Sequence, residues 1–301
     1  MAISRSQLLK ELLPGLNALF GLEYSKYGDE HAEIYETETS DRSFEEETKL
    51  SGFGSAPTKS EGASIEYDTA QEAFTARYTH ETVAMGFAIT EEAIEDNLYD
   101  SLSARYTKAL ARAMAYTKQV KAASLLNGAF SGTTYGDGQT LCSTAHPLVS
   151  GGANSNRPTV GADLNETSLE AAVIQIGQWT DERGLKIATQ PKKLIIPSDL
   201  QFVATRLLET EGRVGTADND INALSNNGSV PGGYTVNHYL TEPNAWFLTT
   251  DIPNGMKHFV RAKMATSMDA DFDTGNSRYK ARERYSFGVS DPLGIFGSPG
   301  A

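Results

Sequence analysis

Residues 30–77 constrain the fold more than any other part of the chain. Two stretches rich in strand-forming residues, 32–50 and 65–85, flank the segment 51–62, whose glycines and proline predict a chain reversal. This pattern predicts a two-stranded arm that projects on the order of 40 Å, at ~3.3 Å per residue. An isolated hairpin is only marginally stable in water, so an arm of this length needs a second surface to lie on. We expect that surface to belong to another copy of the same chain.

The negative charge of the chain is concentrated around this arm. Residues 1–100 contain 21 acidic and 7 basic residues, whereas residues 101–301 contain 18 acidic and 19 basic residues. The two parts can each remain solvated, or they can meet between copies of the chain and fix their register. The sequence shows no basic patch of the kind that binds nucleic acids, and an acidic surface would repel phosphate groups.

The remaining composition predicts a soluble chain without a membrane span. No stretch approaches the ~20 uninterrupted apolar residues that cross a bilayer. The leucines of residues 8–22 recur at helical spacing, which predicts an amphipathic docking arm that is kinked or restarted at Pro14. Cys142 is the only cysteine, so no intrachain disulfide can form and a reducing, intracellular compartment is expected.

Residues 90–127 form the clearest predicted helix. Thr90 is a suitable N-cap, and Asn127 followed by Gly128 is a suitable stop. At 1.5 Å per residue this helix would be about 57 Å long, so we expect it to act as a spine under a broad, thin body. Its apolar residues recur every three or four positions and predict one continuous buried stripe. The stripe comprises Ile94, Leu98, Leu102, Tyr106, Ala109, Ala113, Tyr116, Val120 and Ala123.

A separate compact α/β domain is predicted between this helix and the C-terminal strands. It follows a loop-like segment, 131–165, that is rich in Gly, Ser, Thr and Asn. The predicted elements are a helix over 167–183, a buried strand over 193–197, a helix over 198–209, a polar loop over 210–231, and strands over 234–239 and 245–250.

Two stretches near the C terminus, 257–264 and 278–289, alternate with the period of two that is typical of strands. Their antiparallel pairing would place seven cations on one sheet face, close enough to repel one another without a partner. These cations are Lys257, Arg261, Lys263, Arg278, Lys280, Arg282 and Arg284. The acidic arm of a neighbouring copy is the expected partner, through ion pairs that contribute only ~0–1 kcal/mol each.

The sequence predicts no catalytic, cofactor-binding or metal site. Cys142 and His146 have no second pair of metal ligands nearby, so a structural zinc site is not expected. Residues 269–273 resemble the start of a calcium loop, but Thr274 and Lys280 stand where that loop needs glycine and glutamate. A polar hairpin turn accounts better for this segment. The chain also lacks a phosphate-binding GxxxxGK[ST] loop and a GxSxG nucleophile elbow.

The order of these parts resembles the major capsid protein of tailed bacteriophages, with the fold named after the Hong Kong 97 phage. The resemblance also rests on Ser-Thr-Ala-His-Pro at 143–147, Arg-Tyr-Ser-Phe-Gly at 284–288 and Asp-Pro-Leu-Gly-Ile-Phe-Gly at 291–297. It implies an α+β fold in five parts. They are an N-terminal arm (1–29), an extended hairpin or E-loop with flanking strands (30–89), a peripheral domain with the spine helix (90–149), an axial domain (150–251), and peripheral strands that return to the axial domain (252–301).

The resemblance implies a structural protein that catalyses no reaction and needs no cofactor. Hexamers and pentamers of the chain would form an icosahedral head that encloses double-stranded DNA, assembled in the bacterial cytoplasm and retained in the virion. Scaffolding, portal and decoration proteins would be partners, and the chain's start at Met1 implies a separate scaffolding protein. Some relatives form covalent crosslinks through lysine and asparagine, but lysines on exposed hairpins are common. The candidate inter-subunit contacts are Glu45, Glu46, Glu47, Lys49, Lys59, Arg105, Arg112, Lys257, Arg261, Arg278, Arg282 and Arg284.

Two alternatives stay open at this point. An encapsulin-like nanocompartment shell protein would share the fold but enclose protein cargo, and the long acidic arm favours the phage shell over it. A soluble enzyme that uses the loop containing Cys142 and His146 is the more remote alternative.

Overall fold

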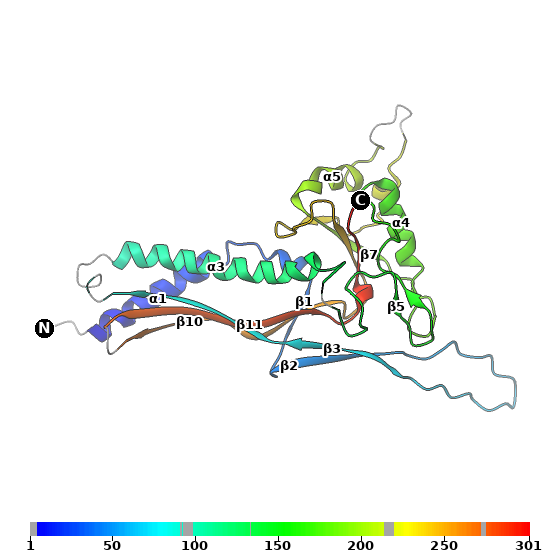
Figure 1. Cartoon of the computed structure of the whole chain (residues 1–301), viewed down its shortest axis with the longest axis horizontal. Coiled ribbons are helices and arrows are strands. Elements are labelled where there is room, and N and C mark those ends of the chain that lie inside the picture. Colours follow the sequence, from blue (N-terminus) through cyan, green and yellow to red (C-terminus); the bar gives the residue numbers. More distant parts are fainter. Residues whose placement is uncertain (1–4, 91, 93–98, 133, 214–219, 272–274) are drawn as a thin grey trace.

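The computed structural model describes residues 5–90, 92, 99–132, 134–213, 220–271 and 275–301. The molecule consists of an elongated body of helices and strands, a compact α/β unit at one end, and a projecting arm (Figure 1). The helical segments are α1 (Arg5–Tyr24), η1 (Glu30–Glu33), α3 (Tyr99–Asn127), α4 (Glu166–Gly177), η2 (Ser198–Leu200), α5 (Gln201–Leu208), α6 (Ala223–Asn226) and η3 (Pro292–Gly294). The strands are β1 (Glu36–Thr39), β2 (Phe44–Leu50), β3 (Glu72–Thr79), β4 (Glu81–Ile89), β5 (His146–Pro147), β6 (Ala153–Asn154), β7 (Pro191–Ile196), β8 (Tyr234–Val236), β9 (Trp246–Thr250), β10 (Met256–Ala270), β11 (Ser277–Val289) and β12 (Ile295–Ser298).

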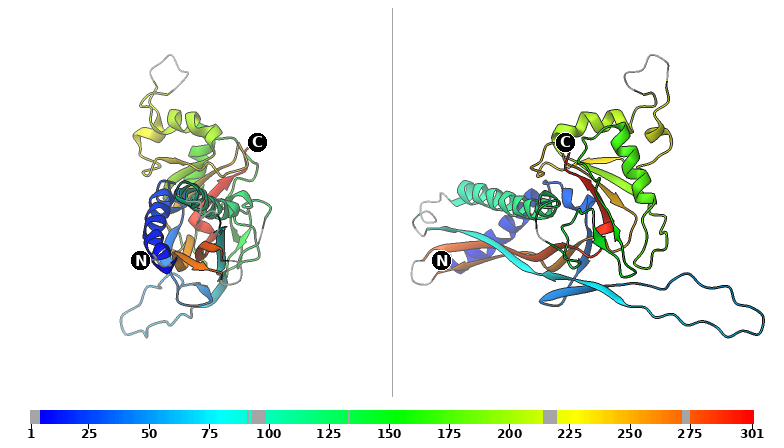
Figure 2. Two further views of the ribbon diagram at one scale, coloured as in Figure 1. Left: turned by 90° about the vertical axis from the view of Figure 1, so that its left-hand side faces the viewer. Right: turned by 45° about the vertical axis from the view of Figure 1, so that its right-hand side comes forward.

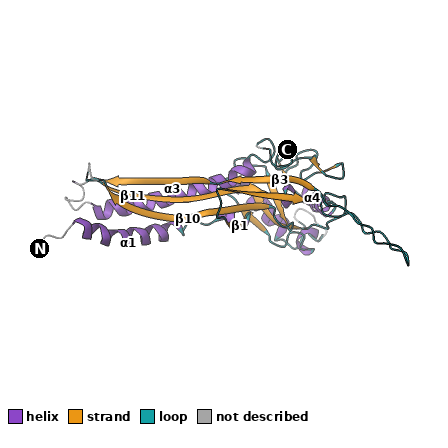
Figure 3. Cartoon of the chain, turned by 90° about the horizontal axis from the view of Figure 1, so that it is seen from below, coloured by secondary structure: helices purple, strands orange, loops and turns teal. Residues whose placement is uncertain are grey.

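The body is a four-stranded sheet in the order β1-β10-β11-β4, with α1 and α3 on one face. Strands β10 and β11 pair antiparallel as predicted, and two irregularities interrupt their register between Val260 and Ala265. Tyr279 and Ala281 of β11 are buried under the helices, in a cluster with Leu110 and Met114 of α3. Figure 3 views the molecule from below and shows the long strands running along the body with the helices behind them.

Helix α1 packs against its own chain, which the sequence did not predict. Leu16 and Phe20 are buried in the cluster that α3 and β11 form. Asn17 adds polar contacts to the sheet, because its Oδ1 accepts hydrogen bonds from Thr266 (2.7 Å) and Tyr279 (3.0 Å). The helix also runs through Pro14 without a break. In this structure the predicted docking arm therefore docks on the body of its own chain.

Helix α3 ends at Asn127 as predicted, but its buried face differs from the predicted stripe. Residues 91 and 93–98, where the helix was expected to begin, lie outside the described residues. Tyr106, Tyr116 and Val120 are exposed although the stripe included them. The buried face instead contains polar positions as well as apolar ones. Its buried residues are Ser103, Thr107, Leu110, Ala111, Met114, Ala115, Gln119, Ala122, Ala123 and Leu126.

The α/β unit contains the sheet β12-β9-β7-β8 with α4 and α5 packed on it. Its core includes Leu169, Ile176, Leu194, Trp246 and Phe296. Helix α4 begins at a capping box in which Asn165 and Ser168 exchange hydrogen bonds. The helix ends at Gly177, six residues before the predicted end at 183, because the chain turns at 177–179.

The arm is a shorter ladder than the sequence predicted. Strands β2 and β3 pair from Phe44↔Thr79 to Leu50↔Glu72, and no strand is formed over 51–71. The predicted strand 32–50 is divided, because β1 pairs in parallel with β10 in the body sheet. The later part of the predicted strand 65–85 likewise enters the body sheet as β4, which pairs with β11. No helix in the described part of the chain is both long and apolar enough to span a bilayer.

Candidate assembly surface

The root of the arm is tied to the body by a buried ion pair. Lys257 of β10 is only 2% exposed, and its Nζ lies 2.9 Å from Glu38 of β1 and also binds Glu47 of β2. Burial lowers the pKa of Lys257, but the hydrogen bonds with Glu47 and Glu38 outweigh burial and hold that pKa above its usual value. Ser290 donates to the second oxygen of Glu47 and bonds Tyr78 of β3. Both strands of the arm are therefore fixed to the body.

A second ion pair fastens the outer end of β2. The Nζ of Lys49 lies 2.8 Å from Asp291 and 3.1 Å from Glu182, which joins the arm to the C-terminal segment and to the α/β unit. A groove of about 440 Å³ lies beside this contact, lined by residues that include Lys49, Leu50 and Asp291. The arm therefore leaves the body in a defined direction.

Several predicted inter-subunit residues thus make contacts within one chain. Glu47 and Lys257 pair with each other, whereas the sequence suggested that each would meet a second copy. Glu45 accepts a hydrogen bond from Ser40 at 2.7 Å. Glu46 is exposed and lies 3.6 Å from Arg77 on the neighbouring strand. The sequence could not predict these partners, because Glu47 and Lys257 are 210 residues apart.

Beyond the ladder, residues 51–71 form a loop, hereafter the distal loop, that extends past the body (Figure 2). Its large apolar side chains are exposed: Phe53 by 62%, Ile65 by 68% and Tyr67 by 89%. The acidic residues Glu61 and Glu66 and the basic Lys59 are exposed as well. Asp68 connects the base of this loop to the α/β unit through Arg183, at 2.9 Å. The rest of the loop presents apolar and acidic groups to its surroundings.

The body sheet has an exposed surface of opposite charge on the face turned away from α1 and α3. Strands β2 and β3 cover one part of this face, where Tyr78 packs on Phe259 with ring centroids 4.8 Å apart. The remaining part, hereafter the uncovered sheet face, consists of exposed residues of β4, β10 and β11. These are Ala84, Gly86, Ala88, Ala265, Ser267, Asp269, Arg278, Lys280 and Arg282. Small side chains, and Asp269 opposite Arg278, thus flank a row of three cations.

The charges on this face are only partly compensated. Arg278 binds Asp271 at 2.5 Å. Neither Lys280 nor Arg282 has an ion-pair partner within the described ranges. The face therefore offers two cations among mostly small residues, which suits an extended acidic segment.

The other predicted cations lie elsewhere. Arg105 and Arg112 belong to α3 on the opposite side of the sheet, and Arg112 donates to Tyr27. They are therefore on a different surface from Arg278 and Arg282, so these four candidate residues do not form one patch. Arg261 and Arg284 are half-buried where the arm joins the sheet. The seven predicted cations therefore do not form one exposed face.

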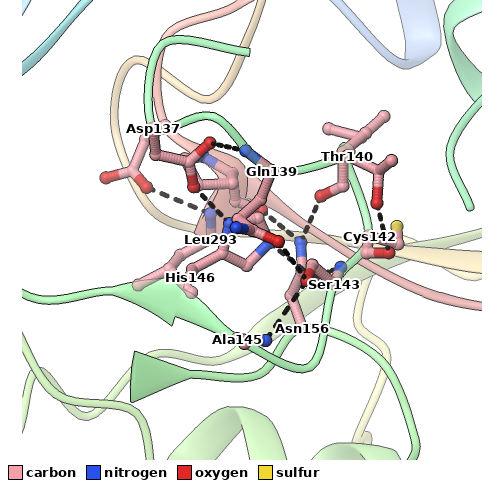
Figure 4. Close-up of polar contacts among 12 residues, drawn as sticks. Asp137, Gln139, Thr140, Cys142, Ser143, Ala145, His146, Asn156 and Leu293 are labelled. Atoms are coloured by element: carbon pink, nitrogen blue, oxygen red, sulfur yellow. Dashed lines mark hydrogen bonds and ion pairs between the residues drawn. The ribbon is translucent and has the colours of Figure 1, made fainter. Parts of the chain in front are cut away.

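Cys142 and His146 do not form a nucleophile–base pair (Figure 4). Cys142 is fully buried, and burial raises the pKa of its thiol far above the usual range. The His146 ring is held by other groups, with Nδ1 2.5 Å from Asp137 and Nε2 3.0 Å from Asn156. The thiol is therefore protonated and His146 is already engaged. No cluster of three metal-ligating side chains occurs among the residues that the structure describes.

Asn156, which binds His146, has a structural role that no sequence pattern predicted. The Nδ2 of Asn156 donates to the carbonyl oxygens of Leu141 (2.7 Å), Pro292 (2.8 Å) and Ile295 (3.1 Å). Its Oδ1 accepts the backbone N–H of Ser143 at 2.8 Å. One buried amide thus joins the segment after α3 to the C-terminal segment, at the junction of the body and the α/β unit.

Comparison with known proteins identifies the family to which this chain is related. A sequence profile of the family described as phage capsid protein matches residues 72–297, and no curated protein matches the sequence. The capsid of the cyanophage P-SCSP1u is 12% identical with a TM-score of 0.58, over 88% of this chain and 85% of that chain. The capsid of a native GTA particle is 14% identical with a TM-score of 0.56, over 90% of each chain.

A virus-like particle from Pyrococcus furiosus is also similar, at 11% identity and a TM-score of 0.53 over 96% of this chain and 99% of that chain. At these identities the likeness shows the fold alone, and it confirms the predicted α+β architecture of a capsid protein. The family match runs from β3 of the arm to β12 of the α/β unit. It confirms the expectation of a phage shell protein and disfavours the soluble enzyme. The chain belongs to the phage capsid protein family.

Proposed function

We propose that this capsid protein forms hexamers and pentamers of an icosahedral head that encloses double-stranded DNA, with the Hong Kong 97 type of subunit. In this proposal the arm is the E-loop, α3 is the spine helix of a peripheral domain, and the α/β unit is the axial domain. The subunit would assemble in the host cytoplasm and remain in the virion. Scaffolding, portal and decoration proteins are its proposed partners, and its contact with DNA is not sequence-specific.

The observation that carries the assembly proposal is the exposure of the distal loop. Phe53, Ile65 and Tyr67 stay in water in the single subunit, although burying a large apolar side chain contributes about 1.5–3 kcal/mol. A second copy can provide the missing surface. Glu61 and Glu66 of the same loop complement Lys280 and Arg282 on the uncovered sheet face of that copy. Apolar burial would supply most of the binding energy, because exposed ion pairs add only ~0–1 kcal/mol each.

The contacts at the root of the arm serve the same proposal. Lys257 and Lys49 hold the ladder against its own body, so the direction of the distal loop is set before a neighbour is met. Pre-organisation of this kind lowers the entropy cost of association. The ion pairs that the sequence assigned to subunit contacts would therefore act indirectly, by aiming the loop.

An encapsulin-like compartment is the second candidate, because the fold is also shared by a virus-like particle, that of Pyrococcus furiosus, and not by phage capsids alone. Both candidates require self-assembly and differ in cargo.

Size-exclusion chromatography and electron microscopy of the purified chain test self-assembly. Capsomers, shells or tubes are expected, and a monomer at all concentrations would contradict both candidates. Nuclease-protected DNA in particles isolated from the natural host would support the phage head, and protein cargo in its place would support the compartment.

A further inference from the structure

His80 occupies the point where the chain leaves the arm and enters the body sheet. It lies between β3 and β4 and is only 6% exposed. Its Nδ1 is 2.9 Å from the hydroxyl of Ser286 in β11, and its Nε2 is 2.9 Å from the hydroxyl of Ser40, between β1 and β2. One imidazole ring thus connects both ends of the arm to the body sheet.

The hydrogen bonds around His80 fix how its protons are arranged. Ser40 lies 2.7 Å from the carboxylate of Glu45 and donates its single hydroxyl hydrogen there. Ser40 must therefore accept from Nε2–H of His80, which leaves Nδ1 to accept the hydroxyl hydrogen of Ser286. A neutral ring satisfies every bond in this relay. A charged ring carries a hydrogen on both nitrogens, so it keeps the contact with Ser286 only if that hydroxyl turns and accepts from Nδ1.

The charges around the ring also favour its neutral form. Burial lowers the pKa of His80, the guanidinium groups of Arg284 in β11 and Arg261 in β10 lower it further, and Glu45 in β2 only partly opposes them. Within the described structure the Nε of each arginine is buried without a hydrogen-bond partner. A charged His80 would therefore be a third cation in a site that already has too few anions.

We propose that His80 is a pH-sensitive pin, which holds the root of the arm when it is neutral and releases the root when it is protonated. Because the folded state disfavours the charged ring, this stabilisation is complete above the ordinary histidine pKa of ~6.5. It is lost as the pH falls through the lower value of the folded state. The local effect is a property of the single subunit. Its consequence, that acid lets the arm change direction during shell assembly, rests on the proposed function.

Hydrogen–deuterium exchange of the unassembled full-length subunit tests the pin. Exchange would be compared between about pH 7.5 and about pH 5, on either side of the ordinary histidine pKa, after correction for the intrinsic pH dependence. Peptides that cover β1, β2 and the start of β4 should lose protection several-fold more on acidification than peptides of β7 and β9. His80→Gln keeps one donor and one acceptor but cannot be charged. In this variant, acidification should therefore not lower the hydrogen-exchange protection of the root peptides more than that of β7 and β9. His238→Gln, at an exposed position, is the matched control and should respond like the unmodified chain.

Two results would overturn the proposal. One is equal acid sensitivity of the root peptides and of β7 and β9. The other is an acid response of the root in His80→Gln that equals the response of the unmodified chain. Arg284→Gln gives an independent check, because removing this charge should shrink the acid response, and an unchanged response would contradict the electrostatic mechanism. Since the measurement uses separate subunits, its outcome does not depend on whether shells form.

Discussion

At the scale of single residues, the arm depends on Lys257, whose ammonium group is buried between carboxylates of β1 and β2. Lys257→Met should lower the free energy of unfolding by about 1–3 kcal/mol, because Glu47 loses its partner in a partly buried site. Lys263→Met, at an exposed position of the same strand, is the control and should change it by less than about 0.5 kcal/mol. Urea denaturation measures both, and equal effects would contradict the assigned role of Lys257.

A second residue-scale prediction concerns Asn156 at the junction of the body and the α/β unit. Asn156→Ala removes a buried amide that donates to three carbonyl oxygens, so a loss of about 2–4 kcal/mol is expected. Asn227→Ala, at an exposed turn position, should have little effect. Thermal unfolding followed by circular dichroism measures the difference. An unchanged melting temperature in Asn156→Ala would show that the junction does not depend on this amide.

At the scale of elements, the distal loop should matter for assembly and not for folding. Replacing Phe53, Ile65 and Tyr67 by serine removes the large apolar groups without touching the β2–β3 ladder. This variant should unfold at the same urea concentration as the unmodified chain but fail to form shells. Glu61→Gln with Glu66→Gln should weaken assembly less, because exposed ion pairs contribute little.

Electron microscopy and sedimentation of both loop variants measure the outcome. Normal shells from the triple-serine variant would rule out apolar docking of the loop. A stronger assembly defect in the Glu61→Gln, Glu66→Gln variant would contradict the proposal that apolar burial contributes more to assembly than ion pairs do.

The elements that the sequence could predict are those with an unambiguous local pattern. Strands β10 and β11 alternate cleanly, and β7 ends in the buried apolar run Leu194 to Ile196, so these strands were expected at these positions. The arm was predicted too long because no glycine or proline marks the turn at Ser40. The prediction of the buried face of α3 was wrong because that face contains the polar residues Thr107 and Gln119, which a search for apolar periodicity does not identify.

The candidate site was less predictable than the fold. Its residue types were recognised, since a surplus of acid in the arm and of cations in β10 and β11 is visible in the sequence. Which of these charges form ion pairs could not be predicted, because the partners of Lys257 and Lys49 depend on how distant segments of the chain pack. Local sequence patterns predict which face of a strand carries the charges, but the tertiary structure determines which ion pairs they form.

At the scale of the whole molecule, the distal loop and the uncovered sheet face are exposed surfaces that differ in chemistry. The distal loop is apolar and acidic, and the uncovered sheet face carries mostly small and basic residues. They belong to opposite parts of an elongated subunit, so one copy can offer its loop to a neighbour while it receives the loop of another (Figure 1). Head-to-tail contacts of this kind close into rings when the rotation between copies permits.

A cryo-electron microscopy map of an assembled particle tests this account most directly. We predict that residues 51–71 of each copy lie across strands β4 and β11 of a neighbour, with Glu61 or Glu66 within ion-pair distance of Lys280 or Arg282. A map in which the distal loop contacts no other copy would contradict the account.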